Sequence, residues 1–259
     1  EQSDLNQALY GRNGECPMVV IAASSPSDCF HYAFMAGKIA MEHMTPVMLL
    51  SDGFIANGSE PWKIPSMADY PAIVPPIVEP REGEEFLPYA RNEKLARGWA
   101  FPGKAGLQHR IGGLEKDHLR GTISHDPKNH QEMVTTRKRK VELVAEELPE
   151  LKVFGAEEAD VLVVGWGGTR GHLHSAVQQL QEEGKSVAHL HFNYIYPMQK
   201  GVADILKRYK RIVVCELNEG QFANYLRQQF TDVVIESYGK TEGQPFTVIE
   251  IKEKVNSML

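Results

Sequence analysis

The sequence contains few cysteines and no long apolar run. Its three cysteines, Cys16, Cys29 and Cys215, are scattered among 259 residues. They cannot supply the four thiolates of an iron–sulfur cluster, and an odd, scattered set is typical of reduced thiols in a cytoplasmic protein. No stretch reaches the roughly 20 apolar residues of a membrane-spanning helix. We therefore expect a cytoplasmic protein without membrane contact and without a cluster of its own.

Positive charge is not in excess either. The chain has 28 Lys and Arg residues against 34 Asp and Glu residues, a formal net charge of −6. This balance argues against a nucleic-acid partner, which is held largely through its phosphate backbone. The basic run 137–140 falls on a predicted amphipathic helix, where a solvated helix face explains it better. The remaining composition, 42% hydrophobic and 24% charged, is that of an ordinary globular protein.

Residues 1–60 predict one β-α-β unit. Apolar strands are expected at 17–23 and 47–50, and Ser25-Pro26 between them has the residue types of an N-cap and a first helical position. Strands that are apolar on both faces indicate a parallel sheet covered by helices. Two strands are too few for a stable domain of this kind. The missing strands are expected before Glu1, from a partner, or from the second domain, and an opening without Met favours the first source.

Residues 61–152 predict an extended linker that crosses between two domains, and residues 153–259 predict a compact α/β domain. Seven prolines from Pro61 to Pro88 disfavour long helices. A helix is expected from Asp126-Pro127 to Pro149. In the last section we expect strands at 161–164, 187–192, 212–215 and 233–235, helices capped by Thr169 and opened by Asn218, and a terminal helix at 250–259.

The stretch 106–130 has neither helical nor strand periodicity. Long irregular segments inside folded chains are usually functional or disordered, and its mixed charges and retained Ile and Leu residues favour order. Its histidines lack the spacing of a metal site, so no metal is predicted. We predict that Asp117 and His118 contact a substrate or a facing subunit, and that His109 follows them in this role.

Three further segments follow predicted strands, at the edge where ligands and partners meet open α/β sheets. The segment 165–171 could hold a phosphate at a helix N-terminus. Arg170 stands at the last glycine position of a dinucleotide fingerprint, however, so a tight turn is favoured. Asn218 and Gln221 have capping-box spacing, which favours a structural role, and Asp52 is either a turn residue or a ligand contact. For subunit contact we select Asp52, Glu216, Asn218 and Gln221.

Several of these segments closely resemble one family. They are EQSDLNQALYG at 1–11, SDGF at 51–54, Pro61-Trp62, HRIGGLEKDH at 109–118, Asp126-Pro127, and Glu216-Leu217-Asn218 with Gly220-Gln221. The family is the alpha subunit of 2-oxoacid:ferredoxin oxidoreductases, particularly the 2-oxoglutarate type. The likeness extends over essentially the whole chain, and HRIGGLEKDH is quite specific to it.

The resemblance implies a fold and a chemistry. These enzymes use thiamine diphosphate to decarboxylate a 2-oxoacid, pass electrons through iron–sulfur chemistry to ferredoxin, and yield an acyl-CoA. The implied fold class is α/β. Residues 1–60 would be the second half of a pyrimidine-binding domain with a partial parallel sheet, 61–152 a linker strap and connecting helix, and 153–259 a transketolase C-terminal-like domain. The 109–118 segment would approach the substrate side.

The resemblance also implies a division of labour. A beta subunit would bind the diphosphate and magnesium, and partner subunits would carry the iron–sulfur cluster. The activating glutamate, arginine and threonine of the family belong to motifs before Glu1, so we assign no catalytic residue here. We expect a C-terminal piece of the subunit that binds no cofactor alone, is inactive alone, and associates with other chains. The alternatives are a non-catalytic assembly module and a nucleotide-binding Rossmann-type protein.

Overall fold

The computed structural model describes residues 1–259 and contains two sheets. The smaller sheet has the strand order β2-β1-β6, in which β1 (Val19–Ala22) is parallel to β2 (Val47–Leu50) and antiparallel to β6 (Tyr194–Tyr196). The β-α-β unit is therefore confirmed, with α2 (Pro26–His43) as its helix. Ser25 caps this helix as expected, since its side chain accepts a hydrogen bond from Asp28 N.

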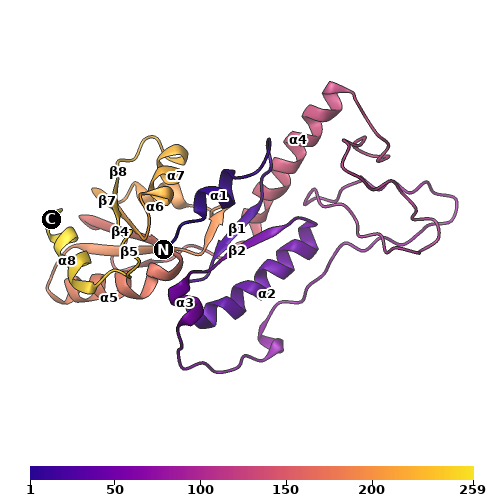
Figure 1. Ribbon diagram of the computed structural model, residues 1–259. Coiled ribbons are helices and arrows are strands. Elements are labelled where there is room, and N and C mark those ends of the chain that lie inside the picture. The colour runs from indigo at the N-terminus through magenta and orange to yellow at the C-terminus, as the bar shows by residue number, and fades with distance from the viewer.

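The third strand of the small sheet comes from the second domain. We favoured residues before Glu1 as the source of missing strands, and for this strand that expectation was wrong. The strand β6 has only three residues and follows β5 (Val187–Phe192) after a single residue, Asn193. No separate apolar run marks it in the sequence. The two sheets are thus joined by consecutive strands of one chain (Figure 1).

The larger sheet has the order β3-β5-β4-β7-β8 and is parallel except for β3 (Val153–Phe154), which pairs antiparallel with β5. Its other members are β4 (Val161–Trp166), β7 (Arg211–Glu216) and β8 (Ile235–Gly239). Strand β8 begins where the predicted strand 233–235 ends.

The helices of this domain are α5 (Arg170–Glu182), α6 (Val202–Leu206), α7 (Gln221–Gln229) and α8 (Val248–Asn256), and a 3-10 turn, η3 (Gly167–Thr169), precedes α5. Thr169 occupies the N-cap position of α5 as expected, but its side chain accepts no capping hydrogen bond and its hydroxyl donates to Trp166 O.

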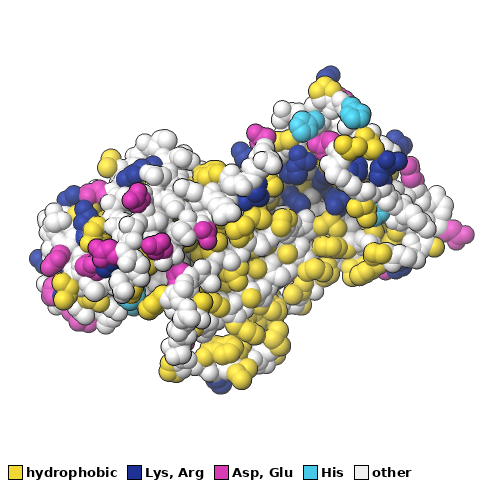
Figure 2. Space-filling model, viewed as in Figure 1, with side chains coloured by type: hydrophobic (Ala, Val, Ile, Leu, Met, Phe, Trp, Pro, Cys, Tyr) yellow, Lys and Arg dark blue, Asp and Glu magenta, His cyan; other side chains and the backbone are white.

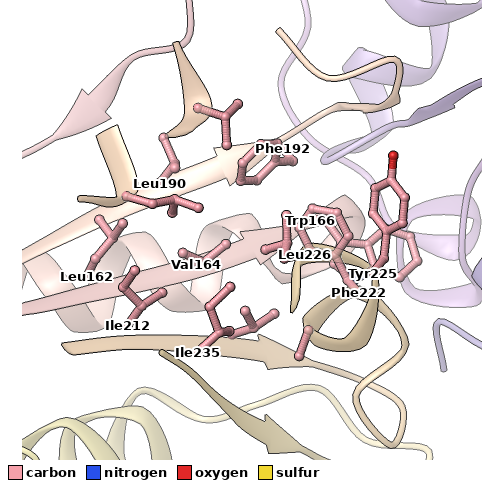
Figure 3. Close-up of a cluster of buried hydrophobic side chains, with 14 of the residues drawn as sticks. Leu162, Val164, Trp166, Leu190, Phe192, Ile212, Phe222, Tyr225, Leu226 and Ile235 are labelled. Atoms are coloured by element: carbon pink, nitrogen blue, oxygen red, sulfur yellow. The ribbon is translucent and has the colours of Figure 1, made fainter. Parts of the chain in front are cut away.

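Alternation along the central strands divides the core into two layers. In β4, Val161 and Val163 pack with α5 and α8, while Leu162, Val164 and Trp166 face the opposite layer. Figure 3 shows this second layer, in which the indole of Trp166 lies near Phe222 and Tyr225 of α7. Because both faces are covered by helices, the strands are apolar throughout, as expected for buried parallel strands.

Strand β1 is shared between two cores in the same way. Val20 and Ala22 join the large core together with Leu5 and Ala8 of α1 (Leu5–Tyr10). Val19 and Ile21 face a smaller cluster that includes Ile39 of α2 and Val141 of α4 (Pro127–Glu142). A 3-10 segment, η2 (Leu143–Glu147), extends α4 toward the second domain. No helix is both long enough and apolar enough to cross a bilayer.

Between α3 (Gly53–Asn57) and α4, residues 58–126 form a long loop whose only helical turn is η1 (Met67–Asp69). It runs along α2 and projects beyond it before α4 returns the chain, and its role as a linker between two domains stays a prediction (Figure 1). Phe30 of α2 packs against Trp62 and Tyr70, and the indole of Trp99 donates to Met41 O at 2.7 Å. These contacts hold the loop in an ordered path.

Candidate functional site

The carboxyl ends of β1, β2, β4 and β7 meet at one junction between the two sheets. Asp52 follows β2 and caps α3, because its Oδ1 accepts from Ile55 N at 2.9 Å. The same carboxylate lies against the turn after β4: a Cβ added to Gly168 would be 2.1 Å from Oδ2 of Asp52. Only glycine allows this close approach. The Asp52 side chain therefore fixes how the small sheet meets the turn of the large one.

At the same junction, Gln2 links the N-terminal segment by hydrogen bonds to the ends of β4 and β7. Its side chain donates to Trp166 O at 2.7 Å and accepts from Leu217 N at 2.9 Å. The amide of Asn218 in turn donates to Gln2 O at 2.9 Å. Gln2 is only 5% exposed, so these bonds are shielded from water and satisfy the ends of both β4 and β7.

Glu216 is a completely buried carboxylate at the end of β7. It accepts hydrogen bonds from Phe222 N at 2.8 Å, Ala223 N at 3.0 Å and Trp166 Nε1 at 3.2 Å. Burial raises the pKa of Glu216, and the hydrogen bonds oppose that rise. Two of its donors are the first free N–H groups of α7, so the carboxylate anchors the start of that helix.

Asn218 and Gln221 do not form the capping box that their spacing allows. Oδ1 of Asn218 accepts from Gly220 N and Gln221 N, both at 2.9 Å. Gly220, at φ +86°, occupies the N-cap position of α7. Gln221 instead reaches the N-terminal segment, accepting from Asn6 N and donating to Ser3 O.

The structure thus gathers the four residues selected for subunit contact at one junction. What it shows there is an interface between segments of the same chain. Glu216 and Asn218 are buried within it, whereas Asp52 and Gln221 are partly accessible. Contact of this set with a second subunit stays a prediction.

The junction leaves little space for a ligand. The cavity beside Gln2, Ala23, Asp52 and Gly167 has a volume of about 30 Å³, which is on the scale of a single water molecule. The Asp52 carboxylate at Gly168 also gives the glycine-rich turn a negative neighbour where a phosphate would have to lie. The tight strand-to-helix turn expected for 165–171 is confirmed, and the geometry argues against a dinucleotide there.

The loop residues chosen for substrate contact lie elsewhere, beside the start of α4. Oδ1 of Asp117 accepts from Leu119 N at 3.0 Å and Arg120 N at 2.7 Å, and these backbone hydrogen bonds lower the pKa of Asp117. His118 Nδ1 is 3.6 Å from Oδ2 of Asp117 and 3.3 Å from Oδ1 of Asn129. The two predicted residues are therefore together, and the loop is held against α4 by the buried Asn129.

His109 is not part of this pair. Its Nδ1 lies 2.8 Å from Leu107 O, and its ring packs edge-on against Phe86 at 5.5 Å between centroids. No hydrogen bond or ion pair joins it to Asp117 or His118. Sequence reasoning missed Gln2, Trp166 and Gly168, because their contacts join residues far apart in the chain and leave no local pattern.

Comparison with known proteins defines the class to which this fold belongs. Residues 1–125 match the family described as pyruvate flavodoxin/ferredoxin oxidoreductase, thiamine diphosphate-binding. Residues 159–251 match the pyruvate:ferredoxin oxidoreductase core domain II. The chain is therefore built from two domains of the thiamine-diphosphate-dependent class of ferredoxin oxidoreductases.

Within that class, the chain belongs to the alpha subunits of the 2-oxoacid:ferredoxin oxidoreductases. It is 44% identical over its whole length to the 2-oxoglutarate oxidoreductase subunit KorA of Mycobacterium tuberculosis, and 30% identical over 91% of its length to subunit alpha of 2-oxoacid:ferredoxin oxidoreductase 1 of Aeropyrum pernix. The resemblance seen in the sequence and the α/β fold class are both confirmed.

A solved structure agrees with this assignment. The 2-oxoglutarate:ferredoxin oxidoreductase of Magnetococcus marinus, with 2-oxoglutarate, coenzyme A and succinyl-CoA bound, superimposes on the entire chain with a TM-score of 0.93 at 29% identity. The chain spans 39% of KorA, 36% of the Aeropyrum subunit and 45% of the Magnetococcus chain. It corresponds to part of each of these proteins.

The residues at the junction do not by themselves fit thiamine diphosphate. The cavity there is too small to hold the cofactor. Glu216 already accepts three hydrogen bonds from the protein, so its carboxylate is not available to exchange a proton with a pyrimidine ring. We therefore derive no step of cofactor chemistry from this chain. What the junction does is hold the two sheets in a fixed relation.

Proposed function

We propose that this chain is part of the alpha subunit of a thiamine-diphosphate-dependent 2-oxoglutarate:ferredoxin oxidoreductase. The 44% identity with KorA, a 2-oxoglutarate oxidoreductase subunit, carries the proposal. In this reaction the 2-oxoacid loses CO2, its acyl group joins the sulfur of coenzyme A as a thioester, and two electrons pass to ferredoxin. The organic chemistry belongs to the cofactor, and the protein supplies orientation and electrostatics.

We assign the remaining parts of the machinery to other chains. A beta subunit would bind the diphosphate with magnesium, and partner subunits would hold the iron–sulfur cluster. Cys215 is buried in the core while Cys16 is exposed, and this placement supports a cluster located elsewhere. The division into 1–60, 61–152 and 153–259 and a cytoplasmic location are parts of the same proposal.

We assign the loop around Asp117 and His118, with His109, to the side of the active site that faces the substrate and the beta subunit. The same loop exposes three large apolar side chains, Ile111 at 85%, Leu114 at 58% and Leu119 at 42%. Large exposed apolar side chains gathered in one segment are typical of surfaces that another chain covers. The loop therefore has the polar and apolar groups that a shared site between subunits requires.

The test uses the complete natural alpha subunit that contains this chain, assembled with its beta subunit, thiamine diphosphate and magnesium. Reduction of a viologen dye is measured with coenzyme A and, in parallel, 2-oxoglutarate, pyruvate and 2-oxobutyrate. We expect 2-oxoglutarate to give the highest kcat/KM, and reactions without coenzyme A serve as the control. No dye reduction with any of the 2-oxoacids would reject the proposal, and a preference for pyruvate would reject its substrate.

A further inference from the structure

A cavity of about 210 Å³ lies between α4 and the long loop, and five of its ten lining residues are basic. The basic residues along its wall are Arg91, Arg97, Lys116, Arg137 and Lys140, and the only acidic one is Glu115. Figure 2 shows Lys and Arg side chains gathered beside α4, between that helix and the loop. Such a concentration of one charge is unexpected in a chain whose net charge is −6.

Glu115 cannot balance the cluster. Its carboxylate already contacts His130 Nδ1 at 2.7 Å and Arg137 Nη1 at 3.5 Å. Three of the cations, Arg91, Arg97 and Lys140, form no ion pair with a carboxylate. Lys116 is buried and donates to the carbonyls of Gly112 and Leu114. The cavity therefore has a clear excess of positive charge.

Neutral groups hold these cations in place. Lys140 Nζ donates to Met44 O at 2.7 Å, and Arg91 Nη1 donates to Tyr89 O at 3.0 Å and His118 O at 3.2 Å. The Arg97 guanidinium lies over the Tyr89 ring, 4.3 Å from its centroid, and donates no hydrogen bond to the protein. None of its N–H donors is thus satisfied by the protein.

The crowding of like charges has an electrostatic cost. Burial, and then the nearby Arg97, Arg91 and Arg137, lower the pKa of Lys140 to about 8. Burial and Arg97 also lower the pKa of Arg91. A bound anion would relieve both effects, because a charge of opposite sign favours the charged form of each side chain.

The basic run 137–140 needs correction in this light. The solvated-face interpretation holds for Lys138 and Arg139, whose side chains are 68% and 58% exposed. It is wrong for Arg137 and Lys140, which line the cavity. The helical period places these two three residues apart on the same side of α4.

We propose that this cavity binds a small molecule that carries phosphate, with Arg91, Arg97 and Lys140 as its contacts. A phosphate or diphosphate group has enough charge and enough acceptor oxygens to engage several separate donors, and guanidinium groups bind phosphate oxygens in pairs. A single carboxylate would leave most of the cluster without a partner. The inference goes beyond the proposed function and does not depend on which 2-oxoacid is used.

The test measures anion binding by calorimetry on the complete holoenzyme, loaded beforehand with thiamine diphosphate and magnesium so that the cofactor's own diphosphate site is filled. The probes are pyrophosphate, inorganic phosphate, coenzyme A and 2-oxoglutarate. We expect Arg97→Gln and Lys140→Met each to weaken pyrophosphate binding at least tenfold and to leave 2-oxoglutarate binding unchanged. Arg139→Gln, a neighbouring exposed position, should leave binding unchanged. If the same variants weaken the binding of coenzyme A and of pyrophosphate to a similar extent, the phosphate groups of coenzyme A are the natural occupant of the cavity.

A second measurement uses the wild-type protein, so its result does not depend on whether a variant folds. Acetylation of lysines by acetic anhydride, followed by mass spectrometry, should show at least threefold protection of Lys140 by pyrophosphate and none of Lys138. Equal labelling with and without pyrophosphate would overturn the inference, as would unchanged pyrophosphate binding in both variants. If the same holoenzyme still reduces viologen normally, this inference alone fails and the proposed function stands.

Discussion

Oδ2 of Asp52 lies where a side chain at position 168 would begin, 2.1 Å from a Cβ built on Gly168. This contact joins the end of β2 in the small sheet to the turn after β4 in the large one. Because Oδ1 of the same carboxylate caps α3, the side chain cannot turn away without losing that bond. The relation between the two sheets therefore depends on a glycine and a short acidic residue facing each other.

Gly168→Ala should displace the Asp52 carboxylate and destabilise the subunit. We expect a loss of about 1–2 kcal/mol in the free energy of unfolding, the size of a lost N-cap, measured by urea denaturation. Gly171→Ala is the matched control, since its Cβ would meet nothing within 4 Å. That change should be neutral or stabilising by up to about 1 kcal/mol. Asp52→Ala should abolish most of the effect of Gly168→Ala, and strictly additive losses would contradict the contact.

Glu216→Gln should destabilise the junction although it removes a charge. Both carboxylate oxygens accept hydrogen bonds, whereas an amide has one oxygen. At least one buried N–H group of Trp166, Phe222 or Ala223 then loses its acceptor, at a cost of about 1–3 kcal/mol. Urea denaturation measures the effect, and Glu219→Gln at an exposed position should change stability by less than about 0.5 kcal/mol. Equal stability of the two variants would show that Glu216 is protonated or dispensable.

Asp117→Asn separates a structural role of Asp117 from a functional one. The Asn oxygen can still accept from Leu119 N and Arg120 N, so the turn and the melting temperature should be kept, whereas Asp117→Ala should lower the melting temperature. If the charge contacts substrate or the beta subunit, both variants lower kcat/KM with 2-oxoglutarate by about tenfold or more, equivalent to about 1.4 kcal/mol. Wild-type turnover of Asp117→Asn would limit Asp117 to shaping the loop.

Lys140→Met should change stability in a pH-dependent way. The pKa of Lys140 is about 8 in the folded chain and about 10.4 in an unfolded one. The folded state therefore binds fewer protons between these values, and wild-type stability rises with pH across this window. Below pH 8 the cost of the charged amine is fully present, so the variant should have its largest relative stability near pH 7 and lose that advantage toward pH 10.

The other charged groups that line the cavity around Lys140 include Arg91 and Arg97 from the loop and Arg137 on α4, together with Glu115. Loss of the hydrogen bond to Met44 O lowers the stability of the variant by an amount that does not change with pH. The difference in unfolding free energy between wild type and variant is measured from pH 7 to pH 10. A difference that is flat, or that grows in favour of the variant, would mean that the amine is not desolvated.

Local patterns were sufficient for much of the fold. The apolar runs that became β1, β2, β4, β5 and β7, and the Ser25-Pro26 start of α2, could be read from the sequence because strand burial and helix capping depend on neighbouring residues. The selection of Asp52, Glu216, Asn218 and Gln221 also came from their position after strands. Parallel strands place those ends at a common edge.

What the sequence determined by itself was the main strands and helices, the α/β class and, through HRIGGLEKDH, the family. Tertiary structure alone decided that β6 completes the small sheet, that Gln2 fastens β4 to β7, and that Arg91, Arg97 and Lys140 share one cavity. The physical reason is distance along the chain. Capping and periodic burial act over a few residues, whereas these contacts join segments whose proximity depends on how the two sheets pack together.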